Sequence, residues 1–257
     1  RLQAYALQKN ISIMGESSEH IEFSRNDKYF IFNKIFNIFF KFIFFLKNFK
    51  IHLFAKKHKS IKFRKDLLIF SKKYISSKKF DNFNSFKSDF FINYKKVIVG
   101  SDVIWQIINN YPFELRFLYF LPKAYKFSYA ASMGEYKIPT FILNKYIAGL
   151  NSFKNLSVRE PIDNNLNQKN YFVDLDPTFL LNKAEWVKLI KKPNFIQYGE
   201  NFNFYFILDT SNINKNKEYI SNSDDLCKNI YAVDHDIGPS EFLYLIKNSR
   251  FILTDSY

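Results

Sequence analysis

The feature that most constrains the fold is a short apolar run, Val97 to Val99, that ends abruptly in Gly100, Ser101 and Asp102. Three consecutive β-branched residues predict a strand buried on both faces, as strands of parallel sheets are. Glycine permits a sharp turn directly after such a strand, and an open α/β sheet binds its ligand where the carboxyl ends of strands meet. We therefore expect Ser101 and Asp102 to line a binding site. Asp102 as the cap of a following helix is the alternative interpretation.

Other strand-like segments also end in polar residues. In chain order these residues are Ser132, Arg159 with Glu160, Asp176, and Asp255 with Ser256. The carboxyl ends of parallel strands share one edge of a sheet, so these side chains are expected to converge. An arginine directly after a short strand is suited to bind a carboxylate or phosphate. A surface ion pair between Arg159 and Glu160 is the alternative.

The pattern of the chain from residue 97 onward is that of an α/β fold. Helices are predicted over residues 2–14 and 139–154 and from Pro239 onward, and strands near 125–132, 156–160, 171–173, 204–208, 230–233 and 251–254. The Lys-Lys-Pro sequence at 191–193 is typical of a link between domains. We predict an N-terminal domain over residues 1–190, with a basic helical insertion at about 28–96, and a C-terminal domain over 194–257. Both ends of the chain fall within expected elements, so both domains are expected to be truncated.

The net charge of +14 is confined to one segment. Residues 28–96 hold 18 lysine or arginine residues and three acidic ones, whereas residues 97–257 carry equal numbers of each sign. The basic residues are mostly lysine, while bidentate recognition of bases and phosphates favours arginine. The aromatic residues follow helical spacing rather than the pattern of a base-stacking sheet. Nucleic acid is therefore not expected as a partner, and drift toward an A/T-rich codon composition is an alternative explanation of the charge.

Residues 29–54 are rich in Phe and Ile but are interrupted by lysines. The uncharged stretches are far shorter than the roughly 20 residues that a transmembrane helix needs. The polar residues Lys34, Asn37, Lys41 and Asn48 fall on one helical face, which predicts an amphipathic helix. Such a helix either packs on its own domain or, within residues 28–80, rests on an anionic membrane surface. The second reading places a cytoplasmic protein peripherally on the inner face of the plasma membrane.

Metal and cofactor sites are not expected. The chain has one cysteine, Cys227, and four scattered histidines without the spacing of metal ligands. Low cysteine usage fits a reducing compartment such as the cytoplasm.

Six segments in a fixed order resemble the polysaccharide pyruvyl transferase family. They are LQAYAL at 2–7, VIVGSDVIWQ at 97–106, FSYAASMG at 127–134, LSVRE at 156–160, DPTFLL at 176–181 with Trp186 after it, and GPSEFLYLIKNSRFILTDS at 238–256. The resemblance implies two Rossmann-like domains similar to the B-type glycosyltransferases. It also implies transfer of a pyruvyl group from phosphoenolpyruvate to a hydroxyl pair of a surface polysaccharide or lipid-linked sugar, with phosphoenolpyruvate as a donor substrate and no cofactor.

The resemblance also suggests roles for the residues at the strand ends. Arg159 is expected to bind the donor, and Asp102 and Asp176 are the candidate catalytic residues. The further substrate-binding candidates are Ser101, Ser132, Glu160, Asp255, Ser256 and Tyr257. Two other functions stay open at this point. One is a sugar-nucleotide-dependent glycosyltransferase of similar fold, and the other is a non-catalytic remnant that binds a membrane surface or a glycan.

Overall fold

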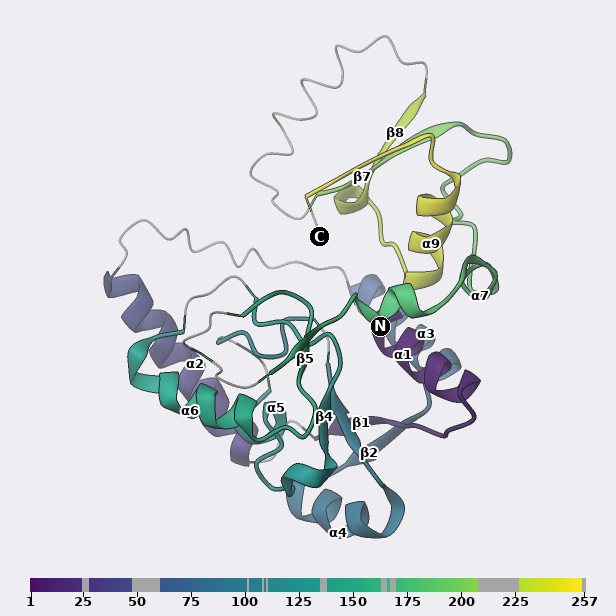
Figure 1. The fold of residues 1–257 in the computed structure, drawn as a ribbon. Helices are drawn as coiled ribbons and strands as arrows, with labels where there is room; N and C mark the ends of the chain where they lie inside the picture. Colours follow the sequence, from purple (N-terminus) through teal and green to yellow (C-terminus); the bar gives the residue numbers. More distant parts are fainter. Residues whose placement is uncertain are drawn as a thin grey trace. The chain divides into compact units, whose positions relative to one another are not determined.

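The computed structural model describes residues 1–24, 28–47, 61–100, 102–107, 109, 111–134, 138–162, 166, 170–207 and 227–255. The fold is α/β with small parallel sheets, drawn in Figure 1. The chain divides into two compact units. The larger unit comprises Gln3–Phe54 and Ser76–Leu180, and the smaller unit comprises Arg1–Leu2, Ala55–Ile75 and Leu181–Tyr257.

Four short parallel strands lie side by side in the larger unit in the order of the sequence. They are β3 (Val97–Val99), β4 (Lys126–Ser128), β5 (Ser157–Val158) and β6 (Phe172–Val173). Strand β3 pairs with β4 and β5 with β6, while isolated bridges at Phe127–Asn155 and Ala131–Val158 join β4 to β5. All four strands run in the same direction, so their carboxyl ends meet at one edge of the unit.

A second parallel pair in the larger unit was not predicted. It joins β1 (His20–Phe23) to β2 (Ser77–Phe80), whereas a helical insertion was expected over residues 28–96. The helix expected there, α3 (Ile61–Tyr74), ends three residues before β2. The partner of β2 lies more than 50 residues away in the sequence, and local periodicity carries no information about such a pairing.

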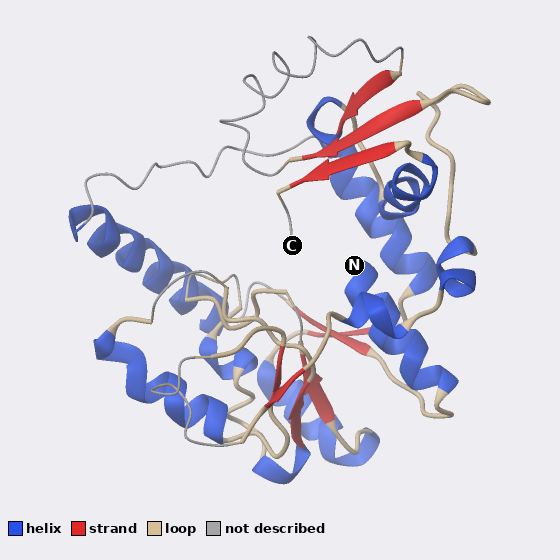
Figure 2. Cartoon of the chain, turned by 45° about the horizontal axis from the view of Figure 1, so that its top comes forward, coloured by secondary structure: helices blue, strands red, loops and turns tan. Residues whose placement is uncertain are grey.

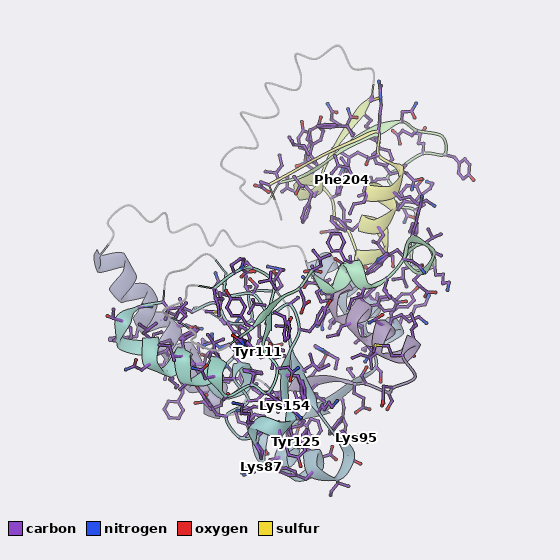
Figure 3. The ribbon with its side chains drawn as sticks, viewed as in Figure 1. Lys87, Lys95, Tyr111, Tyr125, Lys154 and Phe204 are labelled. Carbon is purple, nitrogen blue, oxygen red and sulfur yellow. The ribbon has the colours of Figure 1, made fainter. Side chains whose placement is uncertain are left out.

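The helices of the larger unit pack around these strands, as the blue and red elements of Figure 2 show. They are α1 (Leu2–Ile13), α2 (Lys28–Lys47), α4 (Phe83–Asn93), α5 (Phe113–Arg116), α6 (Thr140–Asn151) and the 3₁₀ turns η1 (Lys123–Tyr125) and η2 (Pro177–Leu180). Helix α4 begins at a capping box, in which Asn82 and Ser85 each bond the other's backbone N–H. Tyr125 packs edge-on against Phe90 of this helix (Figure 3).

The core of the larger unit is built largely from aromatic side chains. Trp105 is fully buried, stacks on Phe117 and meets Phe153 edge-on. Its indole N–H donates to the carbonyl of Arg116 at 2.9 Å, and the Tyr146 hydroxyl donates to the carbonyl of Trp105 at 3.0 Å. Buried aromatic polar groups usually need such partners. These bonds fix the chain directly after β3.

Gly100 is required by the close approach of β3 to the chain that follows β4. A Cβ atom at this position would lie 2.4 Å from the carbonyl oxygen of Tyr129, which belongs to the backbone and cannot swing away. Glycine therefore both permits the turn and allows the two strand ends to lie close together.

Helix α2 turns two asparagines toward its own unit. Asn37 was predicted on the polar face with Lys34, which is exposed, and the amides of Asn33 and Asn37 both donate to the carbonyl oxygen of Asn109, at 2.8 and 2.7 Å. A backbone carbonyl that is partly removed from water needs donors, and these two amides supply them. No helix in the described part of the chain is both long and apolar enough to cross a membrane.

The smaller unit contains a three-stranded parallel sheet in the order β8-β7-β9. Its strands are β7 (Phe202–Phe206), β8 (Lys228–Tyr231) and β9 (Phe251–Thr254). Its helices are α3, α7 (Lys183–Val187), the 3₁₀ turn η3 (Ala232–Asp234) and α9 (Pro239–Asn248). Phe204, labelled in Figure 3, is fully buried on the central strand and meets Phe242 of α9.

We predict that Gly149→Ala destabilises the larger unit. A Cβ atom at Gly149 of α6 would lie 2.5 Å from the ring of Phe117, which is itself fully buried against Trp105. Overpacking of this kind costs about 1–3 kcal/mol of unfolding free energy, measurable by urea titration. Asn144→Ala, at an exposed position of the same helix, is the matched control and should leave the free energy of unfolding unchanged or slightly raised. Equal stability of the Gly149 variant and the wild type would contradict this packing.

Candidate functional site

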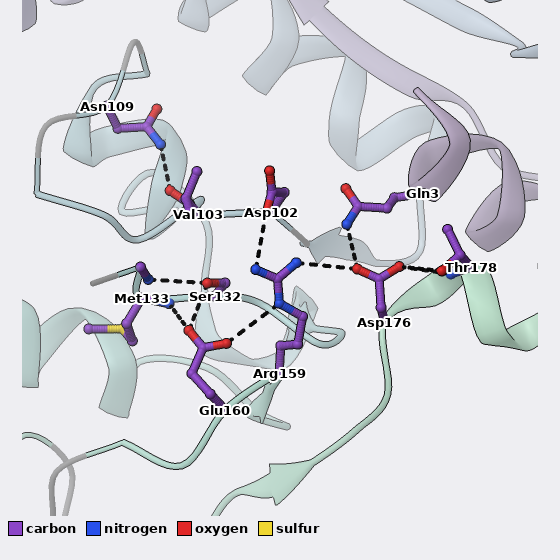
Figure 4. A network of polar contacts seen from close by, with 11 residues as sticks. Gln3, Asp102, Val103, Asn109, Ser132, Met133, Arg159, Glu160, Asp176 and Thr178 are labelled. Atoms are coloured by element: carbon purple, nitrogen blue, oxygen red, sulfur yellow. Dashed lines mark hydrogen bonds and ion pairs between the residues drawn. The ribbon is translucent and has the colours of Figure 1, made fainter. Parts of the chain in front are cut away.

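The carboxyl ends of the four strands converge on one side chain, the guanidinium of Arg159 (Figure 4). Arg159 directly follows β5. Its Nη2 donates to Asp102 after β3 at 3.0 Å, and its Nη1 donates to Asp176 after β6 at 3.3 Å. Its Nε lies 3.6 Å from Glu160. The structure thus brings together the strand-end residues as expected from the parallel arrangement, and the predicted Arg159–Glu160 pair is one part of a larger group.

Asp176 is the most fully bonded of the three carboxylates. Its Oδ1 accepts hydrogen bonds from the backbone N–H of Thr178 at 3.0 Å and from the Thr178 hydroxyl at 2.8 Å. Its Oδ2 accepts from Arg159 and from the side-chain amide of Gln3. A carboxylate has about four lone-pair positions, so this one is filled. Partial burial by itself would raise the pKa of Asp176, but the hydrogen bonds from Thr178, Gln3 and Arg159 lower the pKa below its usual value.

Glu160 connects Arg159 to the chain after β4. Its Oε1 accepts hydrogen bonds from the Ser132 hydroxyl at 2.7 Å and from the Met133 backbone N–H at 2.8 Å. The Ser132 side chain is buried and in turn accepts from the backbone N–H of Gly134. This arrangement fixes the 132–134 loop and places the Glu160 carboxylate beside the guanidinium.

Asp102 is the carboxylate that solvent reaches most easily, with 60% of its side-chain surface exposed against 17% for Asp176. Within the described residues, its side chain is bonded through Oδ1 to Arg159. The next residue, Val103, has a φ of 40°, a conformation that is strained for a β-branched side chain. The Val103 carbonyl accepts from Asn109 at 2.8 Å (Figure 4), which holds the turn in this conformation. Backbone strain of this kind is concentrated at functional sites.

The remaining predicted site residues lie elsewhere. Ser101, Ser256 and Tyr257 are outside the described residues. Asp255 belongs to the smaller unit, where it is exposed and follows β9. In the sheet order β8-β7-β9, the chain passes from β7 to β8 on one side and then crosses to β9 on the other side of β7. Ligands of open α/β sheets bind at the carboxyl ends of strands at such a switch point.

Sequence reasoning missed the residues that orient the group. Gln3 and Thr178 both lie in noted motifs, LQAYAL and DPTFLL, but neither was assigned a contact with Asp176. The Thr178 contact had a local signal, because an Asp that accepts from the residue two positions later is a common turn. Gln3 had none, since 173 positions separate it from its partner.

The net charge of Arg159 and its three carboxylates determines which chemistry the site supports. Three carboxylates surround one guanidinium, which leaves an excess of negative charge. Such a site can stabilise positive charge that develops in a transition state and can accept a proton. Its arginine can bind an anionic group of a ligand, since 27% of the side-chain surface remains exposed. No group of three or more His, Cys, Asp or Glu residues within the described ranges is arranged to hold a metal ion.

We predict that Asp176→Asn lowers stability in a pH-dependent way. The amide loses the ion pair with Arg159 and turns N–H groups toward other donors, at a cost of about 1–3 kcal/mol near neutral pH. The native pKa of Asp176 is depressed, so the advantage of the wild type is fully present above the unfolded-state pKa near 3.8. It disappears as the pH falls through the lower native pKa.

The measurement is urea unfolding of both proteins between pH 3 and pH 7. Asp81→Asn, which changes the same charge at an exposed turn, is the control and should give little difference at any pH. A wild-type advantage for Asp176 that is independent of pH would contradict the assigned hydrogen bonds.

Comparison with known protein families identifies the chain. Comparisons with curated proteins and with solved structures gave no match. The model of one family, described as polysaccharide pyruvyl transferase, matches residues 1–257. This match covers all six of the segments that suggested the resemblance and confirms it, so the chain belongs to the polysaccharide pyruvyl transferase family.

Proposed function

We propose that the protein transfers a pyruvyl group from phosphoenolpyruvate to a pair of hydroxyls on a surface polysaccharide or lipid-linked sugar. The family match supports a transferase of this kind. The observation that carries the assignment to this site is the group of three carboxylates around Arg159 at the carboxyl ends of four parallel strands.

Formation of the ketal requires both a negatively charged group and a cation in the site. Protonation of the donor's methylene carbon creates an oxocarbenium-like centre, and a sugar hydroxyl attacks it and loses its proton. The carbon–oxygen bond to phosphate then breaks, and the second hydroxyl closes the ketal. One hydroxyl proton balances the proton added to the methylene carbon, and the other leaves with the phosphate. Negative charge near the reacting carbon stabilises its positive character, while the donor's carboxylate and phosphate need a cation.

Arg159 is the proposed cation for the donor. Its guanidinium has five N–H donors in a planar fork, which suits a carboxylate. Asp102 is the contact that exchanges most readily, because it is the most exposed of the three and is held through one oxygen. We propose that the donor's carboxylate takes the place of Asp102 at Nη2.

The two aspartates then have different roles. Asp102, once released from Arg159, is the proposed base that accepts the proton of the attacking hydroxyl. Asp176 has its lone-pair positions filled and its pKa lowered, so it stays ionised. Its role is to orient Arg159 and to stabilise positive charge, and it does not supply the proton for the methylene carbon.

We also propose that the two compact units are Rossmann-like domains similar to those of B-type glycosyltransferases, the first drawn from residues 1–190 and the second built mostly from residues 194–257. The sheet order β8-β7-β9 supports this for the second domain, because a first strand with later strands on both sides is the central feature of doubly wound sheets. The consecutive parallel strands β3 to β6 support it for the first domain. Asp255 is the proposed substrate-binding residue of the second domain.

The function is tested with the full chain, labelled phosphoenolpyruvate and a pool of lipid-linked sugars and polysaccharide. The expected result is protein-dependent transfer of the label to the glycan with release of phosphate. Arg159→Ala should abolish both. No transfer to any acceptor of the pool by the wild type, or full transfer by Arg159→Ala, would refute the proposal.

The variant Asp102→Asn distinguishes a role of Asp102 as the base from a role in binding the donor. Loss of a base lowers kcat by about 10²–10⁴-fold. The same change removes a negative charge that competes for Arg159, so the KM for phosphoenolpyruvate should fall or stay unchanged. Asp81→Asn is the control and should alter neither constant. A raised KM with an unchanged kcat would assign Asp102 to donor binding instead.

A further inference from the structure

Helix α2 exposes a continuous apolar surface on the side that faces away from its own unit. The surface, called here the α2 apolar face, consists of Ile31, Phe32, Ile35, Ile38 and Phe39, each between 54 and 68% exposed. Positions 31, 35 and 38 follow one another at helical spacing, and 32 and 39 lie beside them. Contiguous exposed apolar residues on one helix indicate an interaction surface more than isolated ones do.

The opposite side of α2 is attached firmly to the larger unit. Asn33 and Asn37 donate to the carbonyl of Asn109. Phe30 meets Tyr111 and Phe36 meets Phe113, both edge-on. These contacts set the rotation of the helix about its axis, so the α2 apolar face points outward in the packed protein. Figures 1 and 2 both show α2 at the periphery of the larger unit.

The positive charge of the sequence around α2 favours an anionic partner. Within the same unit, residues 28–54 contain five lysine residues and no acidic residue, and Lys34 on α2 is exposed. A second copy of the chain would bring the same positive charge to the contact and would be repelled. An anionic lipid surface attracts that charge and also offers an apolar layer beneath its headgroups.

We propose that α2 docks the α2 apolar face into the interface of an anionic membrane, lying parallel to its surface. Helices that bind in this way combine an apolar face with basic residues and enter only the boundary between headgroups and acyl chains. The five side chains leave water, and the lysines of residues 28–54 provide the electrostatic attraction. This proposal is independent of the reaction proposed above.

The test is co-sedimentation of the full chain with vesicles of phosphatidylcholine alone or with phosphatidylglycerol added. We expect binding to the anionic vesicles, little binding to the neutral ones, and loss of binding as salt is raised. Ile35→Glu and Ile38→Glu should each weaken binding by at least about tenfold, because each removes an apolar group from the interface and adds a repelled charge.

Ile92→Glu is the matched control. Ile92 lies on α4 of the same unit and is 83% exposed, so the change in charge and residue type is the same while the α2 apolar face stays intact. It should bind like the wild type. Circular dichroism melting curves that coincide for all variants establish that the fold is retained.

Three results would overturn the proposal. One is equal binding by the wild type, Ile35→Glu and Ile38→Glu. Another is equal loss of binding in Ile92→Glu, which would assign the effect to net charge alone. The third is a wild-type dimer that dissociates in Ile35→Glu without vesicle binding by either protein, which would make the α2 apolar face a contact between copies of the chain.

Discussion

The ion pairs between Arg159 and three carboxylates hold the candidate site together. Asp102, Glu160 and Asp176 come from the ends of three different strands, and each contacts a different nitrogen of the same guanidinium. A short parallel sheet brings the residues to one edge, and this cation offsets their mutual repulsion. Removal of one partner would therefore disturb the others. The differing exposure of the carboxylates also separates a reachable group, Asp102, from a fixed one, Asp176.

The aromatic core supports the site through the loop after β3. Trp105 is bonded at its indole N–H and at its carbonyl, and Gly100 lets the loop pass close to Tyr129. Val103 and Ala130 both have positive φ values, next to Asp102 and just before Ser132 respectively. Strained backbone on two of the strand ends, held by buried partners, is typical of a site that is organised before its ligand arrives.

The sequence allowed prediction of those parts of the fold and site that depend on local patterns. Short apolar strands that end in small or polar residues indicated where Asp102, Arg159 and Asp176 would meet, because parallel strands have a common polarity. Contacts between distant residues could not be predicted. The pairing of β1 with β2, the contact of Gln3 with Asp176, and the inward side of α2 all depend on partners remote in the sequence. Helical periodicity placed Asn37 on the polar face of α2, but it carries no information on a backbone carbonyl elsewhere that these amides would bond.

The central claim is that Arg159 binds the donor and that Asp102 competes for it. Isothermal titration of phosphoenolpyruvate into the wild type, Arg159→Gln and Asp102→Asn tests this without an acceptor. The account predicts binding by the wild type, affinity at least about tenfold lower in Arg159→Gln, and affinity equal to or higher than wild type in Asp102→Asn. Equal affinity of the wild type and Arg159→Gln would contradict it.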